Sequence, residues 1–388
     1  MARKASQPGL FIEDGREDLD KPADSEMQVL EGFPRAQLQL VVGGEVVSEL
    51  GLLQFDQQIA SATVRMGGIA GLHTDEAHRL KGYARRLMIS AMRWMRRRGF
   101  DTTMLYGIRN FYKRFGYAPA FPSPSFTVAV RDAEMLAAGP FTVVGYRPEY
   151  LKAAIRVYDK TNAGRTGPTR RDPTYWQPWR RGAEYHSKAV CKVLLDRAGS
   201  VVGYFVYSDD YLSPTVIEVG YASVEVFASI LRAAARIAWN QRLENVRLVL
   251  PEDEPFVEFC KPLGLQKEVS YRSDGGAMIR MINIPAALRK VAPVLACRMT
   301  GSGRLNIHTN LDSVGVRWSR GTLAVGRPLQ AAQRVRVPQW ALAEMLYGNR
   351  DASSLAAAGA LAASKKAVAV LDEMFPQRPH FHYLTDKF

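Results

Sequence analysis

The feature that most constrains the fold is a change of hydrophobic period within one short stretch of the chain. Residues 60–74 alternate in the manner of a strand, whereas residues 83–98 place their apolar side chains on one stripe at helical spacing. The stripe consists of Ala84, Leu87, Met88, Ala91 and Met95. Gly99 follows at the position where helices commonly end. A strand that leads through a loop into an amphipathic helix is typical of a layered α/β domain.

The segments on either side extend this pattern. Residues 37–56 are predicted to form a β-hairpin, with the Gly43-Gly44 pair as its turn. The elements expected after the helix are a strand at 102–108, a short helix at 109–117 and a strand at 125–130. The predicted fold class of this first domain, residues 35–137, is therefore an α/β sandwich.

The rest of the chain divides into three further parts. Residues 1–34 are polar, with eight acidic and two basic residues between Glu13 and Glu31, and are predicted to be a polar acidic tail. Residues 138–284 repeat the element order of the first domain without its sequence, which indicates a degenerate structural duplication. Residues 285–388 are predicted to form a third, α+β domain, in which a helix precedes two or three strands and further helices follow.

The positive charge of the chain is concentrated in one place. The formal net charge is +14, and residues 65–120 contain twelve basic and only three acidic side chains. Eight of those basic residues lie within 79–98, which contains no acid. The small residues Gly82 and Ala84 stand where the helix begins, so that backbone N–H groups there are open to an anion. The pattern predicts a phosphate-binding loop before the helix.

Composition excludes several classes of protein. The three cysteines, Cys191, Cys260 and Cys297, are isolated and form no CxxC pair, which argues against a disulfide framework. The first residues lack the apolar run of a signal peptide, and no stretch approaches 18 apolar residues, so a cytoplasmic protein without a membrane span is expected. His73 and His78 flank the basic loop, but no third ligand stands at metal spacing, so no metal site is predicted.

The loop resembles a known cofactor site. Arg79-Leu-Lys-Gly82-Tyr-Ala84 resembles the Arg/Gln-x-x-Gly-x-Gly/Ala pyrophosphate loop of the Gcn5-related N-acetyltransferases (GNAT). Residues 111–121, FYKRFGYAPAF, stand where that family places a catalytic tyrosine on a short helix. The FYKRFGY form, the degenerate second copy and an aromatic C-terminal residue are similar to the enhanced-intracellular-survival (Eis) acetyltransferases. Those have two acetyltransferase-like domains and a sterol-carrier-protein-like third domain, and the resemblance covers about residues 37–388.

The resemblance implies an acetyl-CoA-dependent N-acetyltransferase and assigns its residues. Tyr112 matches the general acid, and Phe388 matches the C-terminal residue whose α-carboxylate is the base. The residues expected to bind acetyl-CoA are Leu72, His73 and Thr74 at a strand end, Arg79, Leu80, Lys81, Gly82, Tyr83, Ala84 and Arg85 in the loop, and Gly107 and Ile108 beside the acetyl group.

The resemblance further implies a primary amine as acceptor, on a polyamine, an aminoglycoside-like molecule or a lysine, and a homo-oligomer, a hexamer in the Eis relatives. The family's first strand and two helices, which line the acceptor site, have no expected counterpart before residue 37. An alternative stays open, namely a non-catalytic protein that binds CoA or a lipid on the same scaffold. Residues 162–181 combine five arginines with Trp176 and Trp179, but a loop between domains or subunits is favoured there over a nucleic-acid site.

Overall fold

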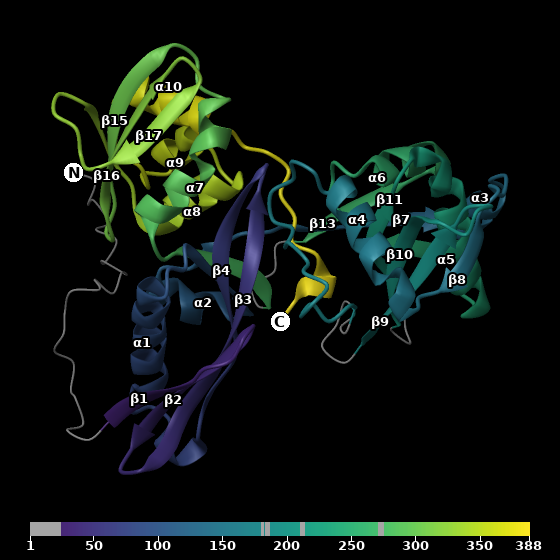
Figure 1. Cartoon of the computed structure of the whole chain (residues 1–388), viewed down its shortest axis with the longest axis horizontal. Helices are drawn as coiled ribbons and strands as arrows, with labels where there is room; N and C mark the ends of the chain where they lie inside the picture. The colour runs from purple at the N-terminus through teal and green to yellow at the C-terminus, as the bar shows by residue number, and fades with distance from the viewer. Residues whose placement is uncertain (1–24, 180–181, 183–186, 210–213, 271–274) are drawn as a thin grey trace, which may run out of the picture. The chain divides into compact units, whose positions relative to one another are not determined.

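The computed structural model describes residues 25–179, 182, 187–209, 214–270 and 275–388. These residues divide into two compact units (Figure 1). The first unit contains the described residues up to Ala120, those from 275 to Arg378, and Phe388; the second contains those from Phe121 to 270 and Pro379–Lys387. Each unit is built around its own seven-stranded sheet.

The sheet of the first unit has the strand order β1-β2-β3-β4-β5-β14-β6. Its strands are β1 Ser25–Leu30, β2 Arg35–Val42, β3 Glu45–Ile59, β4 Ala62–Thr74, β5 Thr102–Gly107, β14 Gly276–Met281 and β6 Ala118–Pro119. All neighbours are antiparallel except β4 and β5, which are parallel. The predicted hairpin and its Gly43-Gly44 turn are confirmed.

Strand β1 corrects the prediction that residues 1–34 are a tail. Residues 25–30 pair with β2, because Met27 and Val29 are apolar at alternate positions and pack against the core of the first unit. The acidic side chains around them hid this short alternation in the composition. Residues 1–24 of the predicted tail lie outside the described residues.

Both faces of this sheet are covered. Helix α1, Tyr83–Arg97, packs one face with the predicted apolar stripe, burying Leu87, Met88, Ala91 and Met95 completely. On the other face lie α7, Ile284–Ala296, and α8, Gln339–Tyr347. Two hydrogen bonds fasten α8 there, from Tyr347 Oη to Gln57 at 2.7 Å and from the Met281 amide to Gln339 at 2.9 Å.

Two strands depart from the predicted domains. The strand expected at 125–130 forms as β7, Ser123–Ala129, but it belongs to the second sheet, where it pairs with β12 and β13. Conversely, β14 follows the last strand of the second sheet in the sequence but pairs with β5 and β6 of the first sheet. Each strand buries its apolar side chains in the unit that receives it, Phe126 and Val128 in one case and Met278 in the other. The sheets therefore do not end at the predicted boundaries, residues 137 and 284.

The second unit repeats the plan of the first. Its sheet has the order β13-β7-β12-β11-β10-β9-β8, and only β11 and β12 are parallel. The remaining strands are β8 Thr142–Gly145, β9 Lys188–Leu195, β10 Val201–Asp209, β11 Thr215–Tyr221, β12 Asn245–Leu248 and β13 Gln266–Ser270. The helices are α3 Val130–Glu134, α4 Leu151–Thr161, α5 Phe227–Asn240 and α6 Pro255–Cys260.

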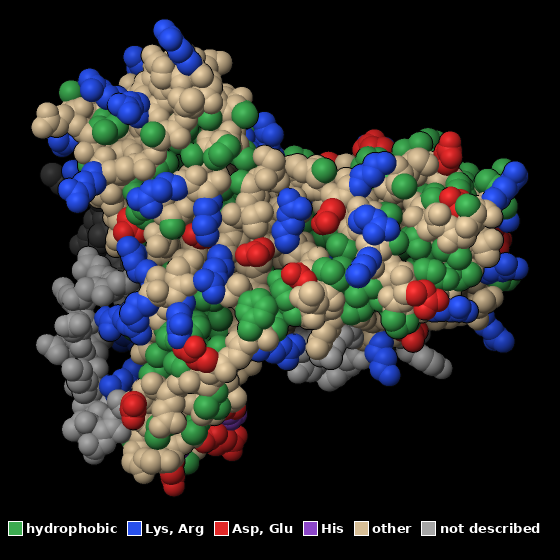
Figure 2. All heavy atoms as spheres, viewed as in Figure 1, with side chains coloured by type: hydrophobic (Ala, Val, Ile, Leu, Met, Phe, Trp, Pro, Cys, Tyr) green, Lys and Arg blue, Asp and Glu red, His purple; other side chains and the backbone are tan. Residues whose placement is uncertain are grey.

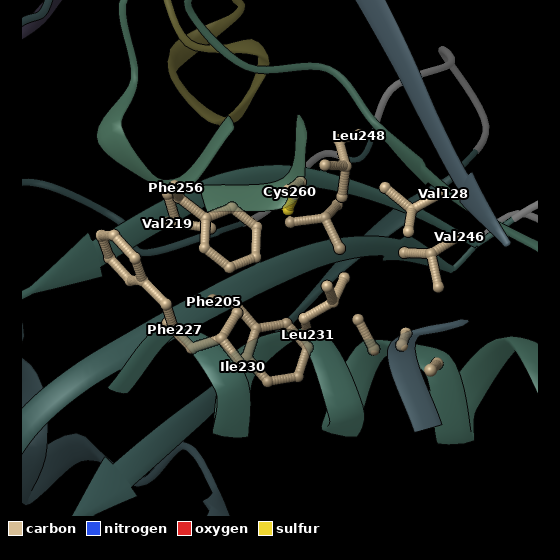
Figure 3. Packing of buried hydrophobic residues seen from close by; sticks show 14 of the residues in the cluster. Val128, Phe205, Val219, Phe227, Ile230, Leu231, Val246, Leu248, Phe256 and Cys260 are labelled. Carbon is tan, nitrogen blue, oxygen red and sulfur yellow. The ribbon is translucent and has the colours of Figure 1, made fainter. Parts of the chain in front are cut away.

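Helix α5 takes in this unit the place that α1 takes in the first. Figure 3 shows Phe227, Ile230 and Leu231 of α5 packing against sheet residues such as Phe205 and Val219. The opposite face is covered by α4 and by the C-terminal tail, residues 379–387. The order of strand, helix and strand around α5 agrees with the repeated element order predicted for residues 138–284.

A third, four-stranded sheet belongs to the first unit. It has the order β17-β16-β15-β18, with β15 Ser302–His308, β16 Ser313–Ser319, β17 Thr322–Gly326 and β18 Gln333–Arg336. Helices α9, Ala352–Ala357, and α10, Lys365–Met374, complete the predicted α+β segment. The likeness of this segment to a sterol-carrier protein stays a prediction. Among the residues that the structure describes, every helix is too short or too polar to cross a membrane.

Candidate active site

The parallel strands β4 and β5 separate before they end. Their pairing stops at Ile69 opposite Leu105, whereas β4 continues to Thr74 and β5 to Gly107. On its other edge, β4 stays paired with β3 as far as Thr74. Within the described part of the chain, the edge of β4 that faces β5 thus has no strand partner beyond Ile69. Such an edge can accept the hydrogen bonds of an extended ligand.

The predicted strand-end residues Leu72, His73 and Thr74 lie along this edge. Ser48 of β3 fixes their position, because its hydroxyl donates to the His73 carbonyl at 2.7 Å and lies 2.9 Å from the Thr74 hydroxyl. The His73 imidazole points instead toward Asp75, 3.4 Å away, and is half exposed. The end of β4 therefore holds the backbone groups of Leu72, His73 and Thr74 in a fixed position.

The basic loop between β4 and α1 forms an open helix N-terminus. Gly82 is the N-cap residue with φ +80°, a conformation that favours glycine, and no side chain caps the first turn. That turn contains no acid. Its first N–H groups consequently have no intrahelical acceptor, and with the helix dipole they favour an anion.

The side chains of the loop are exposed and mostly basic. Arg79 pairs with Glu76 at 3.1 Å and donates to the Thr74 carbonyl at 3.3 Å, which ties the loop to the strand end. Leu80 has φ +63° and is fully exposed, an unusual backbone state for a branched residue. Lys81 is exposed and Arg85 half-buried. Figure 2 shows Lys and Arg side chains gathered over α1 and α2.

Tyr112 is the last residue of α2, Arg109–Tyr112, which begins directly after β5. Its ring lies against Gly107, where a side chain of any size would collide with it. Phe111 packs edge-on against the same ring, with centroids 4.9 Å apart. Burial raises the Tyr112 pKa above its ordinary value, so the phenol keeps its proton at neutral pH. Ile108, the next predicted residue, is exposed beside it.

Phe388 approaches the same strand end from the other face. Its ring lies 5.3 Å from that of Phe55 and 5.5 Å from that of Tyr106, and covers Gly68, where a Cβ would be 2.8 Å from the ring. Tyr106 and Gly107 are consecutive residues of β5, so their side-chain directions are opposite. Tyr112 lies against Gly107 and Phe388 against Tyr106, so the two residues contact opposite faces of one sheet at neighbouring positions of β5.

The structure thus brings together the predicted loop, strand ends, Tyr112 and Phe388 in one unit. The residues that seat the terminal ring, Phe55, Gly68 and Tyr106, were not predicted as part of the site. The Gly67-Gly68 pair inside an apolar strand was the available signal, because glycine in a strand often marks a close approach. Tyr106 packs edge-on against the Phe388 ring.

The described residues contain no group of three His, Cys, Asp or Glu side chains placed to hold a metal. His78 lies beside Tyr83, with ring centroids 6.0 Å apart. His382 is buried, and its Nδ1 lies 3.1 Å from the Gly167 carbonyl in the second unit. Among the described residues, His73, His78 and His382 therefore each have a packing or hydrogen-bonding role.

Comparison with known proteins identifies the domain that holds this site. Residues 28–120 match the family model of the acetyltransferase (GNAT) domain. These residues form a GNAT acetyltransferase domain. The match confirms the prediction of an N-acetyltransferase enzyme.

Solved structures of the same fold extend over almost the whole chain. A conserved protein from Enterococcus faecalis V583 has TM-score 0.76 at 12% identity, covering 92% of this chain and 90% of its own. A GCN5-related N-acetyltransferase from Anabaena variabilis ATCC 29413 has TM-score 0.73 at 15% identity, with 91% and 89% covered. Eis1 from Mycobacterium abscessus has TM-score 0.68 at 17% identity, with 94% and 100% covered. A search of curated protein sequences gave no significant match.

Proposed function

We propose that the first unit transfers the acetyl group of acetyl-CoA to a primary amine at the gap between β4 and β5. One observation carries the proposal: the half-buried Tyr112 and the C-terminal residue contact opposite faces of the strand that borders the gap. A bound thioester in the gap would then have an acid on one side and a base on the other.

The residues fit acetyl-CoA as the donor substrate. The uncapped N-terminus of α1, from Gly82 to Arg85, suits the pyrophosphate, and the neighbouring Arg79 and Lys81 supply positive charge. The free edge of β4 at Leu72–Thr74 suits the amides of the pantetheine arm, which can pair with it as another strand would. Gly107 and Ile108 lie at the end of the gap where the thioester would be.

The transfer needs one proton donor and one proton acceptor. The neutral amine nitrogen bonds to the thioester carbon, the carbon–sulfur bond breaks, and the thiolate takes a proton from Tyr112 Oη. A phenol with a pKa near or above 10 is well matched to a thiolate of similar basicity. Backbone N–H groups at the strand ends steady the negative charge on the carbonyl oxygen.

We assign the α-carboxylate of Phe388 as the base and as an anchor for the acceptor. Its ordinary pKa of about 3.5 makes it a weak base for a free ammonium ion. The nitrogen becomes far more acidic as its bond to carbon forms, so a weak base then suffices. Before that point, the carboxylate attracts a cationic amine. These properties favour polyamines, aminoglycoside-like molecules or lysine side chains as acceptors.

Three broader proposals accompany this one. The second unit is a degenerate copy of the same fold without the Arg-x-x-Gly-x-Ala loop, and the segment from residue 285 onward is a sterol-carrier-protein-like domain. The chain assembles into a homo-oligomer, for which the Eis resemblance suggests a hexamer. Gel filtration with light scattering would measure that assembly directly.

The direct test is CoA release from acetyl-CoA in the presence of a panel of polyamines, aminoglycosides and lysine peptides, followed with a thiol reagent. We expect turnover with at least one amine and its loss in Tyr112→Phe. If no amine is acetylated while acetyl-CoA still raises the melting temperature, the chain is a non-catalytic CoA-binding protein. A fully active Tyr112→Phe variant would refute the acid assignment.

A further inference from the structure

One face of the four-stranded sheet in the first unit is lined by exposed arginines. Along β15, β16 and β18, the buried apolar side chains alternate with residues of the opposite face, and α7 and α10 contact this sheet. The exposed positions of that opposite face include Arg304, Arg317, Arg334 and Arg336. Figure 2 shows Lys and Arg side chains over the lobe that contains β15 and β16.

The strand register gathers these four arginines into one patch. Arg304 lies directly opposite Arg317, and Arg334 lies beside Asn306, two residues after Arg304. Arg336 follows two residues further along β18. With about 4.8 Å between strands and about 3.3 Å per residue, the four Cα atoms span about 16 Å. We call these four residues the arginine face.

The connection from β17 to β18 crosses the same side of the sheet. The Asn306 side chain donates to the Leu329 carbonyl at 2.9 Å and accepts from the Leu329 N–H at 2.8 Å. A Cβ at Gly315 would collide with the Arg327 carbonyl oxygen, so the chain passes directly over β16. The connection is thus held against the sheet, and Arg327 at its start is exposed.

The arginine face has no acidic counterpart in its own sheet. Residues 302–336 contain six arginines, no lysine and one acid, Asp312. Arg96 of α1 engages this acid in two hydrogen bonds, of 2.6 and 3.2 Å. Within the described parts of the chain, the four arginines form no ion pair with a carboxylate. Like charges directly opposite each other destabilise a sheet, so folding alone does not explain Arg304 beside Arg317.

Arginines without acids suit phosphate. The guanidinium presents paired N–H donors to two oxygens of one phosphate and keeps its charge throughout the physiological pH range. Nucleic acid is one polyphosphate, but single strands bind by stacking on exposed aromatic rings, and Trp318 of β16 belongs to the buried face, at 7% exposure. The major groove of a duplex admits a helix or a two-stranded ribbon, not the face of a wider sheet. The observations therefore favour phosphates arranged in a plane.

A lipid bilayer presents its phosphates in such a plane. Clusters of about four to eight basic residues bind anionic lipid surfaces through this attraction. We propose that the arginine face docks the protein peripherally on a bilayer rich in anionic phospholipid, whose phosphates neutralise the clustered arginines. The proposal does not depend on the acetyltransferase assignment, because the arginine face contains none of the candidate active-site residues.

Vesicle cosedimentation of the full-length chain tests the proposal. We expect binding to vesicles of equal parts phosphatidylglycerol and phosphatidylcholine, no binding to phosphatidylcholine alone, and release in high salt. The test variant combines Arg317→Glu with Arg334→Glu. Each basic residue contributes about fivefold to such binding, so the variant should bind at least about 25-fold more weakly. If it fails to fold, Arg317→Gln with Arg334→Gln serves for the same test.

A matched variant separates the arginine face from the net charge. Arg156→Glu with Arg236→Glu makes the same charge change at exposed positions of α4 and α5, and should bind vesicles nearly as well as wild type. Equal losses in the two double variants would overturn the proposal, because binding would then follow net charge alone.

Thermal melts report whether the test variant is folded. Arg317→Glu places an acid opposite Arg304, so this change should not lower the melting temperature although it weakens vesicle binding. A merely structural role for the arginine would give the reverse, a lower melting temperature with unchanged binding, and would overturn the proposal.

The other occupant is tested with a labelled single-stranded oligonucleotide and its duplex. Wild type should bind the anionic vesicles more tightly than either. Retention of an oligonucleotide that the test variant loses, with no binding to vesicles, would overturn the membrane proposal in favour of nucleic acid. Failure of the wild-type chain to bind phosphatidylglycerol vesicles at low salt would overturn it as well.

Discussion

The two parallel strand pairs of the molecule share a plan and differ in chemistry. In the first unit, β4 leads through a basic loop into α1 and returns as β5; in the second, β11 leads into α5 and returns as β12. Both pairs separate early, since β11 leaves β12 at Val216 and continues to Tyr221. The same backbone gap is therefore built twice, and the side chains around it decide what it can do.

The short helices that follow β5 and β12, namely α2 and α6, can be compared residue by residue. Residues 111–117 read FYKRFGY and residues 259–265 read FCKPLGL. Both segments end in a 3₁₀ turn followed by a left-handed glycine, with φ +77° in each case. Cys260 occupies the place of Tyr112, is fully buried, and has its pKa raised by burial to about 12. The second copy keeps the turn and lacks the acid.

The loop before the helix differs just as clearly. In the second unit, the 3₁₀ turn Val224–Val226 with Glu225 leads directly into α5. In the first unit, the residues from Arg79 to Gly82, two of them basic and none acidic, stand between the 3₁₀ turn Glu76–His78 and α1. In the second unit, the sheet face opposite α5 is covered by the C-terminal tail, since Phe381 and Tyr383 pack with Ile217 and Val249. The second unit thus forms the same fold without the basic loop and without a tyrosine at this position, which supports the functional roles proposed for both in the first unit.

The largest expected effect comes from exchanging the acid. Tyr112→Phe keeps the ring packing against Gly107 and removes only the hydroxyl, so kcat should fall by about 10²–10⁴-fold with little change in melting temperature. Steady-state assays of CoA release measure it. The matched change in the second copy, Cys260→Ser, should leave kcat within twofold, about the error of such assays; a comparable loss there would remove the distinction between the units.

Displacing the terminal ring should have the next largest effect. A Cβ at position 68 would stand 2.8 Å from the Phe388 ring, so Gly68→Ala should unseat it and lower kcat about tenfold. Gly145, in β8 of the second unit, has open space around its Cβ position, and Gly145→Ala is the control. The same rate loss in both variants would show that the ring contact is irrelevant.

Reversing one charge in the basic loop should weaken acetyl-CoA binding. Arg85→Glu places a carboxylate in the first turn of α1, and we expect the acetyl-CoA Kd to rise about tenfold. Isothermal titration at two salt concentrations measures it, and the difference from wild type should shrink in high salt. Arg236→Glu, on the exposed side of α5, should change nothing.

The smallest expected effect is on the pH profile. Tyr112 must keep its proton to act as the acid, and burial raises its pKa above its ordinary value of about 10. Activity should therefore persist up to pH values above that value and decline only beyond it. Tyr112→Phe, assayed with the same amine, should lack this decline. A wild-type decline that begins well below pH 10, and is absent from the variant, would contradict the assigned burial.

Much of this comparison could be predicted from the sequence, because it depends on local signals. The apolar stripe of α1, the Gly43-Gly44 turn and the Arg79–Ala84 loop are short-range patterns, and each element formed where it was predicted. The fold class, a mixed α/β arrangement, follows from the order of such elements.

What the sequence could not predict depends on long-range pairing. The exchange of β7 and β14 between sheets leaves each strand's own alternation unchanged, so only the partner strands distinguish the two arrangements. The seat of Phe388 is built from β3, β4 and β5, and no local pattern joins Phe55, Gly68 and Tyr106. The buried pair of Arg171 with Asp386 joins residues more than two hundred positions apart.

The stoichiometry of acetyl-CoA binding tests the central claim most directly, that only the first of the two strand pairs is a donor site. Isothermal titration of the full-length chain should give one acetyl-CoA per chain, and Arg85→Glu should weaken that single site. Two sites per chain, or one site unaffected by Arg85→Glu, would contradict the account.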